Sequence, residues 1–442
     1  MRVARACREL GVSPVGLASE ADAGASWLSA FDQVVSIGGR TPKESYLRLE
    51  AVVQAALQTG CTAVHPGWGF LAESPRFAAL CEQHGLTFVG PTAGIMERMA
   101  LKWPAKRTMA GFGLEGIPGS DGLIPNAEQA RMIADQVGYP CLLKADSGGG
   151  GRGMRKADGP DDVAAAFAAA SAEASAAFGD GSLYLERYLT GGRHIEMQLL
   201  ADGYGNAVHL GERECSIQRN HQKLIEESPS PVLAAAERER IGAAVAAAAA
   251  SIGYTGAGTV EFLLHPDDGR LYFMEMNTRL QVEHPVSEAL TGIDIVQAQL
   301  RIAANQPLGL VQDQIELKGH SIECRINAED PSQDFRPSPG VLGTFEVPTD
   351  QGPGSVRMDT HLAVGDEISP YYDSLLAKVI VHAEDRAAAI ETMERTLRAT
   401  RIEGVATTIP LHLAVLASDE FRRGEYDTTT IPGWQPAAPA SS

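Results

Sequence analysis

The run Glu275-Met-Asn-Thr-Arg-Leu-Gln-Val-Glu-His284 carries polar side chains at every second position. If the run is extended, these side chains share one face, because successive residues of a strand point to opposite sides. Unpaired charges are costly to bury, so this face meets water or a ligand. Oxygen donors beside a guanidinium suit a metal ion next to an anion. The polar residues are Glu275, Asn277, Arg279, Gln281 and Glu283.

A second acid, Glu261, precedes a turn-rich segment at residues 265–270, and another strand-like segment follows that turn. A hairpin folded about Asp268 places Glu261 opposite Glu275, with Cβ atoms roughly 5 Å apart. Two such carboxylates repel each other unless a cation lies between them. With Asn277 as a third oxygen donor, the pattern predicts a Mg²⁺ site that also binds substrate phosphates. The alternative is a solvated hairpin face.

A glycine-rich run spans residues 147–154, between a predicted strand at 139–145 and a predicted helix at 161–178. It matches GxGxxG formally, but a dinucleotide-binding loop opens a helix at once, and here the helix begins later. A P-loop is excluded because no GK[ST] follows the glycines. The run instead predicts a glycine hairpin whose backbone N–H groups close over phosphates, with Lys144 beside it. Such a hairpin on a small unit is typical of a lid.

Two further segments leave alternatives open. Residues 212–223 are densely charged, which is consistent either with a solvated loop or with Gln218, His221 and Lys223 acting as anion donors. Residues 65–71 combine glycine, proline and aromatic side chains around Trp68. This segment is either a shaped loop that approaches a ligand or an ordinary turn with a packing tryptophan.

The elements that must position these residues fall into three regions. Before residue 90, strand-like segments alternate with helical ones, which predicts a parallel α/β sheet with ligands at the carboxyl ends of its strands. The middle region contributes paired strands and an alanine-rich helix at 234–252. The last region, from residue 319, is predicted to form an α+β unit. The strands are expected at 14–18, 33–37, 63–64, 87–89, 183–189, 194–200, 207–210, 320–327 and 374–381, and further helices at 2–10, 45–58, 91–121 and 386–400.

Composition narrows the class of protein. The chain has 442 residues and a net charge of -19, which argues against a nucleic-acid binder. Six cysteines are scattered without metal-ligand spacing, so a reducing cytoplasm is expected. No apolar run approaches the ~18 residues of a membrane span. The arginines at positions 2, 5 and 8 are compatible with a transit peptide, but an apolar stripe at helical spacing favours a structural helix.

Five motifs in this sequence closely resemble those of biotin carboxylase, an ATP-grasp enzyme. The resemblance runs in order over nearly the whole chain. It implies an α/β and α+β multidomain ATP-grasp fold: a parallel α/β domain at 1–100, an ATP-grasp domain at 101–310 with a mobile lid at about 116–190, a C-terminal domain at 318–434 and a disordered tail at 435–442. The motifs are His65-Pro-Gly-Trp-Gly-Phe-Leu71, residues 144–154, Arg219-Asn-His-Gln-Lys223, Phe273-Met-Glu-Met-Asn-Thr-Arg-Leu-Gln-Val-Glu-His-Pro285 and Glu323-Cys-Arg-Ile-Asn-Ala-Glu-Asp330.

The resemblance also implies roles for individual residues. Glu261, Glu275 and Asn277 would bind Mg²⁺, with Mn²⁺ as an alternative. Lys223, Arg279, Gln281, Val282 and Glu283 would form the bicarbonate site, with Glu283 as the base. Arg325 would hold biotin, and Trp68 would line the substrate site. The ATP contacts would be Lys102, Lys144, Gly150, Gly151, Glu186, Leu189, His194, Gln218 and His221.

The implied activity is ATP-dependent carboxylation of biotin through carboxyphosphate, the first half-reaction of an acyl-CoA carboxylase in fatty acid synthesis. No Ala-Met-Lys-Met motif is present, so biotin is expected on a separate carrier protein, with carboxyltransferase subunits as further partners and a homodimer as the assembly. The family's first strand and Asn-Arg-Gly-Glu-Ile-Ala motif are missing, and Trp68 stands where tyrosine is common. The competing hypotheses are another ATP-grasp carboxylate ligase, an inactive assembly subunit, and a misassigned start codon.

Overall fold

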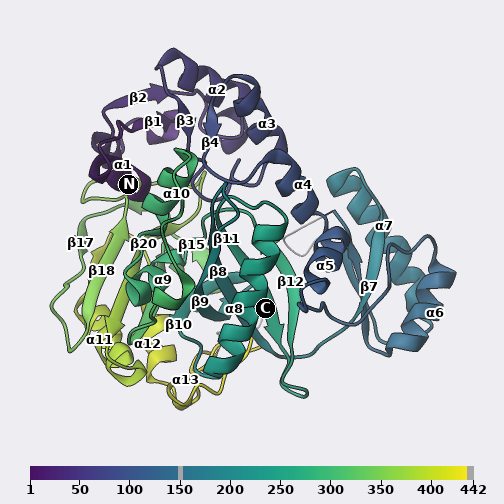
Figure 1. Cartoon of the computed structure of the whole chain (residues 1–442). Helices are drawn as coiled ribbons and strands as arrows, with labels where there is room; N and C mark the ends of the chain where they lie inside the picture. The colour runs from purple at the N-terminus through teal and green to yellow at the C-terminus, as the bar shows by residue number, and fades with distance from the viewer. Residues whose placement is uncertain (148–152, 436–442) are drawn as a thin grey trace.

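An eight-stranded antiparallel sheet forms the centre of the molecule in the computed structural model, which describes residues 1–147 and 153–435 (Figure 1). Its strand order is β12-β11-β8-β9-β10-β13-β20-β18. The predicted C-terminal strands therefore extend the sheet of the middle region, because β13 pairs with β10. The strands are β8 Arg193–Ala201, β9 Ala207–Arg219, β10 Gln222–Ser228, β11 Gly256–Leu264, β12 Leu271–Asn277, β13 His320–Asn327, β18 Ser355–Thr360 and β20 Leu375–Ala383.

Helices pack on this sheet and bury its apolar side chains. Helix α8 lies on β8 and β9, and α11 lies on β13 and β20. Under α8, the rings of Phe262 and Phe273 meet edge to face at 6.3 Å, a favoured aromatic geometry that fixes β11 against β12. The helices of this part of the chain are α8 Ala235–Ser251, α9 His284–Thr291, α10 Ile295–Ala303, α11 Arg386–Ala399, α12 Ile409–Ala417 and α13 Asp419–Arg423.

A small unit with its own core projects from the main body on the right of Figure 1. Its three-stranded antiparallel sheet has the order β6-β5-β7. The predicted helix at 161–178 is confirmed from Val163 onward, and Asp162 is its N-cap residue. The predicted glycine hairpin of the run 147–154 falls largely on residues 148–152, which lie outside the described residues. The elements are α6 Ala127–Val137, β5 Cys141–Ala145, β6 Met154–Ala157, α7 Val163–Phe178 and β7 Leu183–Arg187.

The N-terminal region contains parallel strands, as predicted, but in two separate pairs, β1-β2 and β3-β4. The helix predicted at 45–58 begins only at Leu49, because a 3₁₀ turn closed by Thr41 and Glu44 precedes it. The helix predicted at 91–121 is two helices that end at Ala110, since Leu101 adopts an extended conformation between them. The elements are α1 Arg2–Glu9, β1 Val15–Ala18, β2 Gln33–Ser36, α2 Leu49–Gln58, β3 Ala63–Val64, α3 Pro75–Gln83, β4 Thr87–Phe88, α4 Ala93–Ala100 and α5 Lys102–Ala110.

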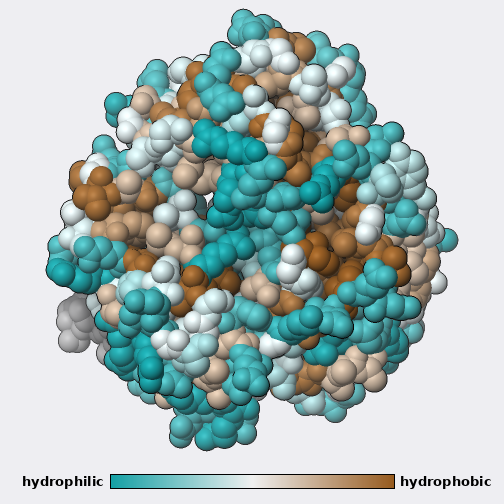
Figure 2. Space-filling model, turned by 60° about the vertical axis from the view of Figure 1, so that its left-hand side comes forward, coloured by the Kyte–Doolittle hydropathy of each residue, from teal (hydrophilic) through white to brown (hydrophobic). Residues whose placement is uncertain are grey.

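Short strands complete the C-terminal region, and the predicted tail falls mostly on residues 436–442, which are not described. Within the described ranges, no helix is both long and apolar enough to span a membrane. On the face shown in Figure 2, hydrophobic residues form several separate patches with hydrophilic side chains between them. The short strands are β14 Glu329–Asp330, β15 Arg336–Pro337, β16 Gly340–Val341, β17 Thr344–Glu346, β19 Glu367–Ile368 and β21 Arg401–Glu403.

Candidate active site

The β11–β12 hairpin places the predicted metal ligands together. Glu261 lies directly opposite Glu275, as the sequence predicted, and the register shifts by one residue immediately after Glu261. The turn closes where it was expected, with the Arg270 amide donating to Asp268 Oδ1 at 3.0 Å. Asn277 Nδ2 donates to Glu261 Oε1 at 2.9 Å. Three oxygen-bearing side chains therefore meet at one end of the hairpin.

The prediction that residues 275–284 are extended throughout is wrong beyond Asn277. Strand β12 ends there, and α9 begins at His284 with Pro285 in its first turn. Proline favours that position because its fixed φ suits a helix and its missing N–H is not needed there. Glu73, from the N-terminal region, accepts from the Thr278 amide at 3.1 Å and so draws the chain away from the sheet.

The polar side chains of this run still converge, although the backbone turns. Arg279 donates to Glu73 Oε2 at 2.7 Å, to Gln281 Oε1 at 3.0 Å and to Asn277 Oδ1 at 3.1 Å. Val282 is buried, and its carbonyl accepts from Lys378 Nζ at 2.5 Å. One guanidinium thus links the predicted metal ligands to the predicted anion site.

Lys223 lies at the centre of the site, where its ammonium meets three carboxylates. Its Nζ is 2.5 Å from Glu283 Oε1, 2.6 Å from Glu196 Oε2 and 3.3 Å from Glu261 Oε1. Burial disfavours the charged amine, but the attraction of these carboxylates outweighs burial and raises the pKa of Lys223 well above its ordinary value. Lys223 is therefore a permanent cation that neutralises the surrounding acids.

Glu283 is fully buried between two cations. Its second oxygen accepts from Arg325 at 2.8 Å, opposite the contact with Lys223. Burial raises the pKa of this carboxyl, but Lys223, Arg325 and Arg213 together lower it well below its ordinary value. Arg325 also donates to Glu226 at 2.6 Å. Glu283 is accordingly ionised and held in one orientation.

The charged run at 212–223 forms a hairpin rather than a solvated loop. Residues 212–217 are buried in β9, and the chain turns at Asn220 and His221, which both have positive φ. Strand β10 then returns, with Lys223 opposite Gln218. This hairpin carries Lys223 into the sheet, whereas the His221 side chain remains exposed at the turn.

The lysines predicted to contact ATP are held by acids. Glu186 is buried and accepts from Lys144 at 3.0 Å and from Lys106. Burial raises the pKa of Glu186, but these two lysines more than offset it and lower the pKa. Lys102 forms an ion pair with Glu275 of β12 and so connects these lysines to the β11–β12 hairpin. These lysines gather beside the hairpin in an arrangement suited to a polyphosphate.

The structure does not join every predicted residue to this network. His194 is joined, since its Nε2 lies 3.3 Å from Glu261. Gly150 and Gly151 lie outside the described residues. Within residues 1–147 and 153–435, no side-chain hydrogen bond or ion pair links Leu189, His221 or Trp68 to the network, and the Trp68 side chain is exposed.

Several members of the network were missed by sequence analysis. Glu196 shares a strand face with His194, so the same period-two argument could have found it. Glu73 carries no comparable local signal, because it meets Arg279 across 206 positions of the chain. The missed residues are Glu73, Lys106, Glu196, Arg213 and Glu226.

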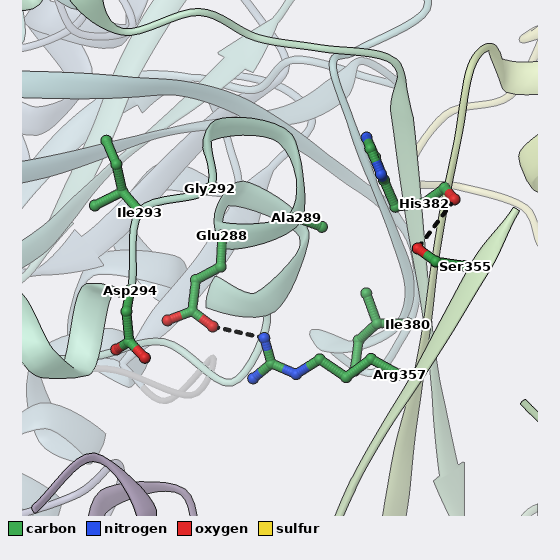
Figure 3. Close-up of a pocket in the computed structure, with 9 residues that line it drawn as sticks. All are labelled: Glu288, Ala289, Gly292, Ile293, Asp294, Ser355, Arg357, Ile380 and His382. Carbon is green, nitrogen blue, oxygen red and sulfur yellow. Dashed lines mark hydrogen bonds and ion pairs between the residues drawn. The ribbon is translucent and has the colours of Figure 1, made fainter. Parts of the chain in front are cut away.

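The middle of α9 is anchored by a separate set of charges. Arg357 of β18 donates to Glu288 at 2.7 Å beside a pocket of about 330 Å³ (Figure 3). Arg2 of α1 donates to the other Glu288 oxygen at 2.8 Å. Because Glu283 immediately precedes α9, these contacts help to fix its position.

The donor set fits Mg²⁺ in its chemistry. Glu261 and Glu275 offer carboxylate oxygens on facing strands, and Asn277 offers an amide oxygen, which are ligands that hard divalent cations prefer. In the structure, Lys223 and Lys102 neutralise these carboxylates. A divalent ion bound with a polyphosphate would take over that neutralisation while the lysines turn to the phosphates.

Comparisons with known proteins match this architecture along the chain. The family model of the biotin carboxylase N-terminal domain matches residues 1–96, that of the carbamoyl-phosphate synthase L chain ATP-binding domain matches residues 102–311, and that of the biotin carboxylase C-terminal domain matches residues 323–433. A biotin carboxylase of Nostoc sp. is 47% identical over 98% of this chain and 96% of its own length. A pyruvate carboxylase subunit of Methanothermobacter thermautotrophicus is 46% identical over 97% of this chain and 86% of its own length.

A solved structure of a biotin carboxylase domain is also similar to this chain. The biotin carboxylase domain dimer of Hydrogenobacter thermophilus 2-oxoglutarate carboxylase, in complex with MgADP, ADP and bicarbonate, superposes with a TM-score of 0.91. It is 46% identical, and the match covers 97% of this chain and 93% of that one. The chain therefore belongs to the biotin carboxylase family of ATP-grasp ligases.

Proposed function

We propose that this chain carboxylates biotin on a separate carrier protein, as the first half-reaction of an acyl-CoA carboxylase. Family membership accounts for the half-reaction, in which ATP, Mg²⁺ and bicarbonate are used to carboxylate biotin. The observation that carries the assignment to this site is the position of Glu283. It lies between Lys223 and Arg325, and Lys223 in turn touches Glu261 of the β11–β12 hairpin.

ATP would lie between the small unit and the β11–β12 hairpin. Lys102 and Lys144 would turn from Glu275 and Glu186 to the phosphates, and His194 would contact the nucleotide beside Glu261. Gly150, Gly151, Leu189, Gln218 and His221 complete the proposed ATP site. Mg²⁺ or Mn²⁺, held by Glu261, Glu275 and Asn277, would offset the charge on the transferred phosphoryl group.

Bicarbonate would bind where Lys223, Arg279 and Gln281 converge beside Glu283, near the Val282 backbone. Its deprotonation by Glu283 would make it a better nucleophile toward the γ-phosphorus of ATP, forming carboxyphosphate and ADP. Lys223 and Arg279 would hold the anion in line for attack. Closure of the small unit over the site would exclude water, which hydrolyses carboxyphosphate.

Biotin would bind on the other side of Glu283, at Arg325. Carboxyphosphate would break down to CO₂ and phosphate, and that phosphate would remove the proton from biotin N1. The Arg325 guanidinium would stabilise the negative charge that develops on the ureido oxygen. Trp68, on its exposed loop, would line the approach for a biotin delivered by a carrier protein.

The wider assignment concerns partners. We propose a cytoplasmic homodimer that works with a biotin carrier protein and carboxyltransferase subunits in fatty acid synthesis. The similarity to a biotin carboxylase and the dimeric form of the Hydrogenobacter domain support this proposal. The carboxyltransferase chooses the final acceptor, and two of the similar proteins are named as parts of pyruvate and 2-oxoglutarate carboxylases.

The test is release of ADP from MgATP and bicarbonate, with and without free biotin. Strong stimulation by biotin is the expected result. Bicarbonate-dependent ADP release that biotin does not stimulate would support formation of carboxyphosphate. It would contradict the assignment of Arg325 to biotin binding. Faster turnover with an amino or keto acid than with bicarbonate would replace the proposal with another carboxylate ligase.

A further inference from the structure

Glu323 is a buried acid beside the site that none of the assigned roles uses. It lies on β13, two residues before Arg325, and its side chain is fully buried. Within the described residues, neither of its carboxyl oxygens has a hydrogen-bond partner. Its nearest cation is Lys378 of β20, whose Nζ is 4.0 Å away. A buried carboxyl without partners is costly if it is ionised.

A second unpartnered oxygen lies on the neighbouring strand. Glu226 of β10 is directly opposite Glu323 in the antiparallel pair. Arg325 engages Glu226 Oε1, whereas Glu226 Oε2 is buried and has no partner in the described part of the chain. Directly opposed residues of this kind have Cβ atoms roughly 5 Å apart. The two unsatisfied carboxyl groups are therefore positioned to satisfy each other through one proton.

The surrounding charges favour protonation of the Glu226–Glu323 pair. Arg325 and Lys378 face this cluster, against the carboxylates of Glu226, Glu283 and Glu323. Asp359 of β18 lies 4.0 Å from Lys378, but Arg357 pairs with this carboxylate at 2.6 Å, so it adds no unpaired acid. Three carboxylates thus oppose two cations, because Lys223 is already shared among Glu196, Glu261 and Glu283. Neighbouring like charges at short range favour retention of a proton.

The pKa values agree with this geometry. Burial raises the pKa of Glu323 to about 8; Lys378 and Arg325 oppose the rise, and Glu226 and Glu283 add to it. Burial also raises the pKa of Glu226, against the effect of Arg325. At neutral pH the pair therefore holds one proton, and the two groups titrate as a unit.

We propose that Glu323 is a positioning residue that shares one proton with Glu226 and so weakens the contact between Glu226 and the Arg325 guanidinium, which holds the biotin ureido oxygen. The proposal rests on the assignment of biotin to Arg325 made above. With the proton in place, Glu226 has a second hydrogen bond and attracts Arg325 less strongly. Without it, an additional carboxylate competes for the guanidinium, and biotin binds more weakly.

The proton can be detected without any turnover. Difference infrared spectra between the wild type and Glu323→Gln separate the carbonyl stretch of a protonated carboxyl from the bands of carboxylates. We expect a protonated-carboxyl band in the wild type at neutral pH that disappears with a midpoint near pH 8 and is absent from the variant. A wild-type spectrum without this band at pH 7 would overturn the shared proton, whatever the enzyme's substrate.

Kinetics test the positioning role. We expect the wild-type KM for biotin to rise about tenfold above pH 8, while bicarbonate-dependent ADP release without biotin changes little. Glu323→Gln, which keeps a neutral group of the same shape, should lose this rise. The matched control is Glu316→Gln, an exposed acid paired with Lys318, which should retain the wild-type profile.

Two results would contradict the positioning role. One is an alkaline rise in KM for biotin that persists unchanged in Glu323→Gln. The other is a Glu323→Gln variant that is folded by circular dichroism but binds biotin poorly at neutral pH, which would mean that the ionised acid is required. If the wild type shows no biotin stimulation at all, the proposed function fails instead, and the infrared result still stands by itself.

Discussion

Lys223 Nζ lies 2.5 Å from Glu283 Oε1; the Glu283 side chain is buried, and that of Lys223 is 11% exposed. The contact keeps Glu283 ionised but also lowers its pKa, so in this arrangement the carboxylate is a weak base. Binding of an anion beside Lys223 would draw part of the lysine's charge away and so raise the pKa of Glu283. If bicarbonate binds beside Lys223 as proposed, it competes with Glu283 for the same ammonium group, and Glu283 becomes a stronger base.

The first prediction concerns that base. Glu283→Gln should lower kcat for biotin-dependent ADP release by at least about 100-fold, since removal of a general base acts on the chemical step. Affinity for MgATP should change by less than about threefold, because Glu283 is not among the proposed ATP contacts. Steady-state kinetics and calorimetric titration with a non-hydrolysable ATP analogue measure the two effects. A variant with near wild-type kcat would remove Glu283 from the role of base.

The second prediction concerns the proposed metal ligands of the β11–β12 hairpin. Removing divalent ions with a chelator should abolish ADP release, and either Mg²⁺ or Mn²⁺ should restore it. Glu275→Gln should raise the Mg²⁺ concentration needed for half-maximal activity by about tenfold or more, because one of two facing carboxylates is lost. Full ATP cleavage in metal-free protein would contradict the assignment of this hairpin.

The third prediction tests the contact between Glu73 and Arg279. Glu73→Gln should raise the KM for bicarbonate by about tenfold, because it loses a charged hydrogen bond that orients Arg279. Glu50→Gln is the matched control, since Glu50 pairs with Arg76 on the exposed surface. Initial rates over a range of bicarbonate concentrations measure the change. Equal KM values in the two variants would show that Arg279 is oriented by other contacts.

The fourth prediction is a stability that depends on pH. Glu227 is buried and accepts from His320 at 2.7 Å and from Arg386 at 2.6 Å. Burial raises the pKa of Glu227, but these partners outweigh burial and lower it from 4.5 to about 2. The ionised form is thus bound more tightly in the folded state. Its stabilising contribution is present above pH 4.5 and is lost as the pH falls towards 2.

The measurement for Glu227 is urea unfolding of the wild type and Glu227→Gln. At pH 7 the variant should be less stable by roughly 3–5 kcal/mol, because the Arg386 guanidinium loses its buried carboxylate partner. Below pH 4.5 the free energies of unfolding should converge, since protonation weakens the same ion pairs in the wild type. A difference that stays constant over this pH range would mean that Glu227 acts through packing rather than through its charge.

The local patterns in the sequence determined the hairpin of the site. Turn residues around Asp268 and the period of two in the flanking strands placed Glu261 opposite Glu275, and strand β13 lies where it was expected. These predictions succeeded because side-chain direction in a strand depends only on neighbouring residues. The prediction that residues 275–284 are extended failed at Thr278. There a contact from Glu73, which is distant in sequence, turns the chain.

Only the tertiary structure decided which charges neutralise one another. Lys223 meets Glu196, Glu261 and Glu283 across 27, 38 and 60 positions of the chain. The sequence contains these residues but carries no signal of their distances, because that spacing depends on how β8, β10, β11 and α9 pack together. The ionised state of Glu283 and the raised pKa of Glu323 follow from burial and from those distances, so neither could be predicted from residue type and spacing.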